Sequence, residues 1–264
     1  MRVPFPTSSL HRYTILTPLL LLPSTHALTT SRLSSMASPL HQVFDHLRSH
    51  PHETFLLDGG TGEELFRRGV PDDRQLWSAT ALVHPQYHSI LQDVHEAFLQ
   101  SGSRMVTTNS YGVVPGVGFS DEEIVQYMDT AGKIARRAVD QFVADNNPQH
   151  QCFVFGSLGP LVESYRADLI LPHDNGVQCY TRACRALLPH VDAFLGETLS
   201  CVEESLQIVD AVEGLSSKDK RPPLLLSYTL DSSGNLRDGQ DVTEAIRQLL
   251  KETKSKQTVE CKYV

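Results

Sequence analysis

The stretch from Thr54 to Leu65, TFLLDGGTGEEL, sets the pattern that the rest of the chain follows. Its apolar residues Phe55 to Leu57 predict a short buried strand that runs directly into Asp58 and two glycines, before a helix begins near Thr61. In α/β proteins, helices cover the sheet faces and leave the carboxyl ends of parallel strands open, so functional groups gather there. Asp58 is therefore a candidate functional residue, although the pattern also suits an acid that only caps the next helix.

The same alternation of an apolar run and an amphipathic segment repeats along the chain. Further buried strands are expected from Met105, Cys152, Ala193, Leu224 and Cys261. This alternation indicates βαβ units and a parallel sheet, and no glycine-rich nucleotide-binding sequence follows a strand. We therefore expect an α/β fold of the (β/α)8 TIM-barrel type, incomplete here with about six of the eight units. Apolar residues at helical spacing predict helices over 41–50, 85–100, 121–146, 176–190, 202–215 and 242–251.

Composition narrows the function classes. The chain has 264 residues, of which 40% are hydrophobic and 20% charged, as in soluble globular proteins. A formal net charge of -8 argues against nucleic acid or an anionic membrane as the main partner. The cysteines are odd in number and include no Cys-x-x-Cys pair, so we expect reduced thiols and no disulfide framework. They are Cys152, Cys179, Cys184, Cys201 and Cys261.

Residues 1–45 differ in kind from residues 46–264, which we assign to a single barrel domain. An apolar run from Thr14 to Pro23 follows two arginines, and serine and threonine are frequent. The run is about half the roughly 20 residues that a membrane span needs, so no transmembrane helix is expected. Three interpretations stay open: a secretory-type signal, which could begin a bipartite organellar leader; a mitochondrial leader; and an over-extended N-terminus with the true start at Met36. The last predicts a cytoplasmic protein, and the others an organelle or the secretory pathway.

Several motifs, read together, resemble the homocysteine S-methyltransferase family, over residues 54–264. Such proteins are (β/α)8 barrels that move a methyl group from a sulfonium donor, commonly S-methylmethionine or S-adenosylmethionine, to homocysteine and so form methionine. The resemblance implies this activity, with homocysteine and a small methyl donor as partners; the oligomeric state is left open. The motifs are LLDGGTGEEL at 56–65, LWSATALVHPQYHSILQDVHEAFLQSGSRMVTTNSY at 76–111, GSLGP at 156–160, ETLSCVEE at 197–204 and LSYTLDSSGNLRDGQDVTEAI at 226–246.

The resemblance also implies a zinc ion held by three cysteine thiolates, which would bind the homocysteine sulfur as a thiolate. In the family, the first cysteine lies in an Asn-Cys sequence after the sixth strand and the others in a Gly-Gly-Cys-Cys run near the eighth. Neither sequence occurs in this chain, which ends at Val264. Cys179 and Cys184 are five residues apart and do not share a helix face well. We therefore expect no complete zinc site, and assign no metal-binding or catalytic residue.

The expected function of this chain is accordingly substrate binding. By the resemblance, Asp58 and Gly59 would lie near the homocysteine backbone, and Glu197 would pair with its ammonium group. Glu197 could instead be an ordinary acid at the start of the next helix. Thr108, Asn109 and Tyr111 could contact substrate or only shape their loop, and Ser157 and Gly159 are expected to offer backbone groups to the same pocket.

Two functional hypotheses follow. The first is a homocysteine S-methyltransferase that has been truncated before its zinc-binding cysteines and is inactive in this form. The alternative is a catalytically dead module that binds homocysteine or another protein. A reading frame that continues beyond Val264 into the missing cysteines would favour the enzyme.

Overall fold

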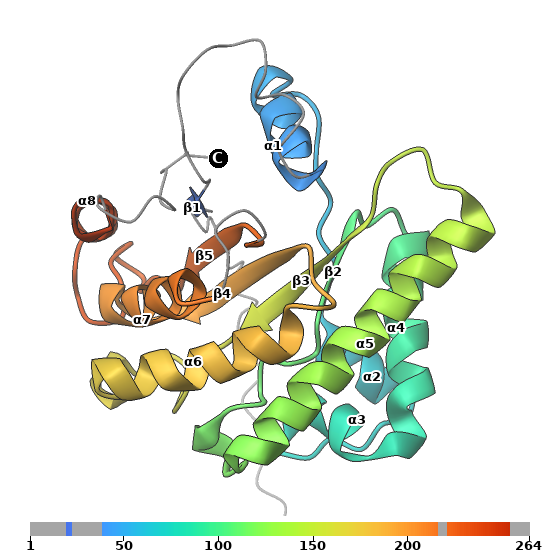
Figure 1. The fold of residues 1–264 in the computed structure, drawn as a ribbon, viewed down its shortest axis with the longest axis horizontal. Coiled ribbons are helices and arrows are strands. Elements are labelled where there is room, and N and C mark those ends of the chain that lie inside the picture. The colour runs from blue at the N-terminus through green and yellow to red at the C-terminus, as the bar shows by residue number, and fades with distance from the viewer. Residues whose placement is uncertain (1–19, 23–38, 216–220, 254–264) are drawn as a thin grey trace, which may run out of the picture.

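The computed structural model describes residues 20–22, 39–215 and 221–253. Its strands form a sheet in the order β1-β5-β4-β3-β2 (Figure 1). Strands β2 to β5 are parallel to their neighbours, and β1 pairs antiparallel with β5. This arrangement confirms the α/β class with a parallel sheet. The strands are β1 (Leu20–Leu22), β2 (Met105–Thr107), β3 (Phe153–Leu158), β4 (Ala193–Leu199) and β5 (Leu224–Tyr228).

Helices α4 to α7 form a layer along the parallel strands, and α1 lies apart from that layer (Figure 1). Short 3-10 turns lie at Trp77–Ala79, Pro85–Tyr87, Pro115–Val117 and Ala167–Leu169. The helices are α1 (Pro39–Ser49), α2 (Thr61–Arg67), α3 (Thr80–Val83), α4 (His88–Gln100), α5 (Asp121–Asn146), α6 (His173–Leu187), α7 (Val202–Glu213) and α8 (Val242–Glu252).

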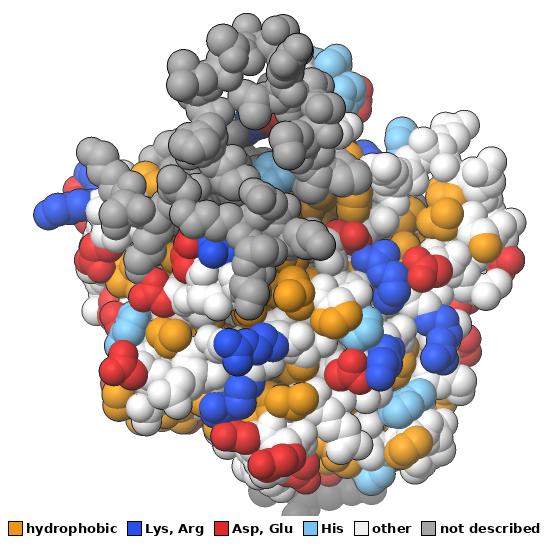
Figure 2. Space-filling model, in the orientation of Figure 1, with side chains coloured by type: hydrophobic (Ala, Val, Ile, Leu, Met, Phe, Trp, Pro, Cys, Tyr) orange, Lys and Arg blue, Asp and Glu red, His pale blue; other side chains and the backbone are white. Residues whose placement is uncertain are grey.

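The two faces of the sheet bury different side chains because successive residues of a strand point to opposite sides. Phe194, Leu224 and Leu226 pack in the large cluster that includes the apolar sides of α4 to α7. Phe155 and Leu225, at alternate positions, belong to a second buried cluster that includes residues of α1. This second face corresponds to the interior of a barrel. Over the surface seen in Figure 2, acidic, basic and apolar side chains are interspersed.

The expected buried strand at Phe55 to Leu57 is wrong. The segment has no regular strand structure, and Leu56 and Leu57 are each 48% exposed. The carbonyl of Leu56 accepts a hydrogen bond from the Arg104 amide at 2.9 Å. The next available amide, that of Thr107, is taken by the side chain of Asp58. The ladder therefore stops after one bond, because a carboxylate replaces the backbone acceptor.

Other boundaries differ by a few residues. Strand β4 continues to Leu199, so Glu197 lies within it, and α6 begins earlier than expected, directly after Pro172. Helix α1 crosses the boundary expected between residues 45 and 46. The expected strand at Cys261 lies outside the described residues, as does almost all of the N-terminal leader. No helix in the described ranges is long and apolar enough to span a membrane.

Candidate functional site

Polar side chains gather at one end of the inner face of the sheet. Thr107, Ser157 and Glu197 lie two residues after Met105, Phe155 and Leu195 of the inner apolar cluster. Because strand side chains alternate with a period of two, these polar residues continue the same face toward the carboxyl ends of their strands. The inner face is thus apolar at one end and polar at the other. The polar end is where a (β/α) barrel carries its chemistry.

Glu197 is the acid of β4 at this polar end. Its Oε1 accepts a hydrogen bond from Ser157 Oγ at 2.5 Å. Burial raises the pKa of Glu197, the hydrogen bond from Ser157 lowers it, and the nearby charge of Asp58 raises it. The two predicted acids therefore share one site, where the charge of Asp58 disfavours the ionised form of Glu197.

Asp58 follows the irregular segment at Phe55 to Leu57 and is held by a single neighbour. Its Oδ2 accepts a hydrogen bond from the Thr107 amide at 2.6 Å, and its Oδ1 accepts one from Thr107 Oγ1 at 3.0 Å. Burial raises the pKa of Asp58 despite these two bonds, which lower it. The sequence does not single out Thr107 as a site residue, although its position beside Thr108 at the end of a strand is where site residues are expected. The Asp58 side chain does not cap α2, whose N-cap is Gly60 without a side-chain hydrogen bond.

The backbone of β4 is distorted where it presents Glu197. Its pairing with β5 shifts register between Gly196 and Leu199. Thr198, directly after the acid, has a φ of 64°, a region that β-branched residues rarely adopt. Bulges re-aim side chains near sites, and strained residues gather at functional positions. The distortion therefore supports Glu197 as a functional residue.

Thr108 and Asn109 shape the site from behind. Thr108 is 2% exposed, and its Oγ1 accepts a hydrogen bond from the Ser157 amide at 2.9 Å. Asn109 is 5% exposed, and its Nδ2 donates to the carbonyl of Ser78 at 2.7 Å. Of the two alternatives left open for these residues, the structure favours loop shaping, because their side chains are occupied by protein groups.

Tyr111 and the predicted glycines also make close contacts. Tyr111 Oη lies 2.6 Å from Ser164 Oγ; burial raises the pKa of this tyrosine, and the charge of Glu197 also acts on it. A Cβ atom on Gly159 would lie 2.7 Å from the Tyr111 carbonyl, so this glycine permits the loop to approach. A Cβ atom on Gly59 would lie 2.8 Å from the Phe98 ring. The structure therefore brings Tyr111 near Glu197, while both glycines serve close packing.

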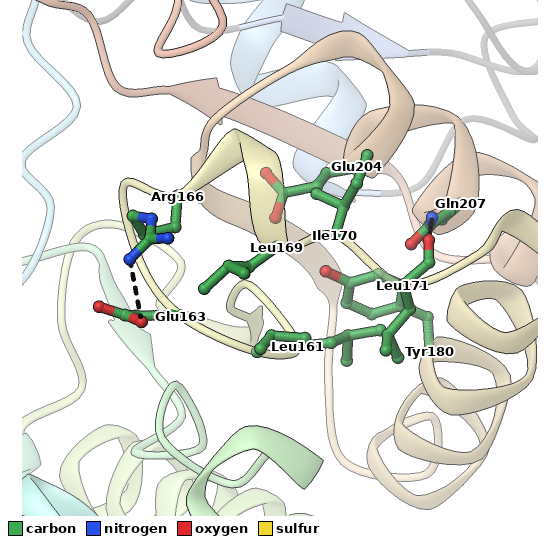
Figure 3. Close-up of a pocket in the computed structure, with 10 residues that line it drawn as sticks. Leu161, Glu163, Arg166, Leu169, Ile170, Leu171, Tyr180, Glu204 and Gln207 are labelled. Carbon is green, nitrogen blue, oxygen red and sulfur yellow. Dashed lines mark hydrogen bonds and ion pairs between the residues drawn. The ribbon is translucent and has the colours of Figure 1, made fainter.

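A third acid, Glu204, is buried beside a separate cavity between α6, α7 and the segment 161–171 (Figure 3). Its Oε2 accepts a hydrogen bond from the Ser200 amide at 2.6 Å, just before α7. Burial raises its pKa to about 7. The helix-start role that the sequence allowed for Glu197 thus belongs to Glu204. This cavity also contains the side chains of Tyr180 and Gln207, from α6 and α7.

The described cysteines do not fit the zinc site of the family. Within the described ranges, no group of three or more Cys, His, Asp or Glu side chains could hold a metal ion. Burial raises the pKa of Cys184 and that of Cys201, the latter to about 11, so both thiols are protonated at neutral pH. A zinc ligand must be a thiolate. Because these two thiols are buried and belong to no group of three possible ligands among the described residues, we assign neither of them to a zinc site.

Comparison with known proteins places this geometry in a family. The homocysteine S-methyltransferase family matches residues 55–262. Homocysteine S-methyltransferase of Escherichia coli is 28% identical over 225 residues, which are 81% of this chain and 69% of that protein. Selenocysteine methyltransferase of Astragalus bisulcatus is 33% identical over 111 residues, 40% of this chain and 31% of that protein.

Solved structures agree with the sequence match. The metallated form of the homocysteine methyltransferase MmuM from Escherichia coli superposes with a TM-score of 0.65 and 26% identity, over 78% of this chain and 74% of that one. The incomplete barrel is consistent with this similarity. The family match over most of the chain and the shared fold together show that this chain belongs to the homocysteine S-methyltransferase family.

Proposed function

We propose that this chain binds L-homocysteine, with Glu197 and Asp58 receiving its ammonium group. The observation that carries the proposal is the pair of adjacent acids with raised pKa values at the polar end of the inner face. Among the described residues, neither acid forms an ion pair with a lysine, arginine or histidine. A ligand cation would supply the missing charge through strong charge-assisted hydrogen bonds.

The reaction that the family implies is the transfer of a methyl group from a sulfonium such as S-methylmethionine or S-adenosylmethionine to the homocysteine thiol. That thiol must lose its proton, and zinc is the group that would stabilise the thiolate. We assign to the described residues the binding of homocysteine, and to none of them the binding of zinc. The residues named here act by binding and orienting the amino-acid part of the substrate.

Titration calorimetry with L-homocysteine under reducing conditions tests the binding. We expect wild-type protein to bind, and Glu197→Gln to weaken binding by about tenfold or more, because an amide cannot supply the negative charge. Glu122→Gln, on the exposed first turn of α5, is the control for loss of one acid far from the site. Equal affinity in the wild-type and Glu197→Gln proteins would contradict the proposal.

An inactive homocysteine-binding or interaction module is the second candidate function, and methyl transfer is the property that separates it from an enzyme. Purified protein is incubated with zinc, L-homocysteine and either sulfonium donor, and methionine is measured by mass spectrometry. We expect binding but no methionine. Formation of methionine at a rate that depends on the protein would show that this chain is itself an active methyltransferase.

A further inference from the structure

Buried hydroxyl groups just after β2 bond the backbone of Ser157, whose own hydroxyl bonds Glu197. Ser110 Oγ donates to the carbonyl of Ser157 at 2.9 Å and lies 2.8 Å from Thr108 Oγ1. Since the Ser110 proton is used on that carbonyl, Thr108 is the donor to Ser110. Thr108 Oγ1 in turn accepts from the Ser157 amide at 2.9 Å, and Ser157 Oγ donates to Glu197 Oε1 at 2.5 Å. The donor of each of these hydrogen bonds is therefore fixed.

The burial of these groups makes the arrangement rigid. Thr108 is 2% exposed, and Ser110 and Ser157 are 0% exposed, so water does not compete for the hydroxyl groups. Hydrogen bonds in such surroundings are strong, and leaving a member unpaired is costly. Thr108 and Ser110 thus hold the backbone of Ser157, and the Ser157 hydroxyl in turn holds one oxygen of Glu197.

The two acids of the site differ in how many of their carboxylate oxygens already accept a hydrogen bond from the described residues. Both oxygens of Asp58 are hydrogen-bonded to Thr107. In Glu197 only Oε1 receives a hydrogen bond from the described residues. Oε2 of Glu197 receives no hydrogen bond from the described residues and is therefore the more available acceptor for a ligand. A carboxylate that is held through one oxygen presents its other oxygen in a defined direction. This lowers the entropic cost of ordering the side chain when a ligand binds.

We propose that Ser157 is a positioning residue: its hydroxyl, carried on a backbone that Thr108 and Ser110 hold, fixes Glu197 so that the second carboxylate oxygen meets the ammonium group of the ligand. This inference rests on the proposed function, since it needs an aminated ligand at Glu197. Ser157 itself does not touch the ligand, because its side chain is fully buried behind Glu197. This differs from the role expected from the sequence, in which Ser157 offers a backbone group to the substrate.

The test compares Ser157→Ala with wild type by titration calorimetry, using L-homocysteine and 4-mercaptobutanoate, which lacks the amino group. We expect Ser157→Ala to weaken L-homocysteine binding roughly tenfold, the effect of a lost hydrogen bond to a charged group. The pH at which affinity is half-maximal should also move upward, since the bond favours the ionised carboxylate. Affinity for 4-mercaptobutanoate should stay unchanged.

Ser205→Ala is the matched control, because Ser205 Oγ is also buried and donates to a side chain, Tyr228 Oη, at 2.6 Å. It should lose comparable stability without a shift in the pH profile. Should Ser157→Ala fail to fold, Ser157→Cys, which keeps a weak donor of similar size, should give an intermediate loss. An unchanged affinity and pH profile in the Ser157 variant would overturn the positioning role alone. Absence of L-homocysteine binding in wild type would overturn the proposed function, and this inference with it.

Discussion

Single residues in the site combine structural and chemical roles. Asp58 ends the pairing of its segment with β2, since its carboxylate takes the Thr107 amide that a backbone carbonyl would otherwise bind. It also lies close enough to Glu197 for its charge to raise the pKa of that acid. The sequence could suggest both acids, because each follows an apolar run. It could not show the bonds of Thr107 or Ser157, because these join segments far apart in the chain.

His95 on α4 is a second residue whose environment sequence reasoning does not reveal. It is 0% exposed, and neither ring nitrogen has a hydrogen-bond partner among the described residues. Burial lowers its pKa from 6.5 to about 4, so the imidazole is neutral in the folded protein. Because its folded pKa lies below its unfolded value, the stability that neutral His95 allows is present above pH 6.5 and is lost as the pH falls toward 4.

His95→Leu should therefore stabilise the protein and remove part of its acid sensitivity. We expect a gain of about 1 kcal/mol at pH 7, because two unpaired buried nitrogens are replaced by carbon. Between pH 6.5 and 4 the wild type should lose up to about 3 kcal/mol that the variant keeps. Urea unfolding across this pH range measures both effects, with a leucine substitution at the exposed His52 as the control. Parallel losses in wild type and His95→Leu would contradict this explanation.

The helices match the ranges predicted from their sequence patterns more closely than the strands do. Helix α5 spans Asp121–Asn146 as expected, because Ser120 and Glu123 form a capping box at its start and apolar residues repeat at helical spacing. A run of three apolar residues at Phe55 to Leu57 has no comparable start signal. Whether it forms a strand depends on partners supplied by distant segments, and here Asp58 ends the pairing. The extension of β4 through Glu197 likewise depends on its pairing with β5.

The capping box of α5 offers a direct test of this argument. Ser120→Ala removes the hydroxyl that accepts a hydrogen bond from the Glu123 amide at 3.2 Å. We expect a loss of about 1 kcal/mol in the free energy of unfolding, the usual cost of losing a serine cap. Urea unfolding monitored by circular dichroism measures it, beside Thr130→Ala, whose hydroxyl bonds only within the helix. A loss no larger than that of the control would show that helix spacing alone sets the start of α5.

Across the whole molecule, the parallel strands carry an apolar cluster at one end of their inner face and the acids Asp58 and Glu197 at the other. This polarity could be expected from the sequence, because successive strands end in polar residues. The fold class and the family follow from those strand ends read together. The placement of Tyr111 against Gly159 could not be predicted from the sequence, because it depends on how two loops pack.

The central claim, that Asp58 and Glu197 receive the ammonium group of homocysteine, is tested most directly by proton release on binding. Titration calorimetry of L-homocysteine at a series of pH values, in two buffers of different ionisation enthalpy, measures the protons exchanged. Both acids have raised pKa values in the free protein, so an arriving cation should lower those values and expel protons in the pH range where the acids titrate. Glu197→Gln should reduce the release. Binding of L-homocysteine without proton release at any pH of the series would contradict the account.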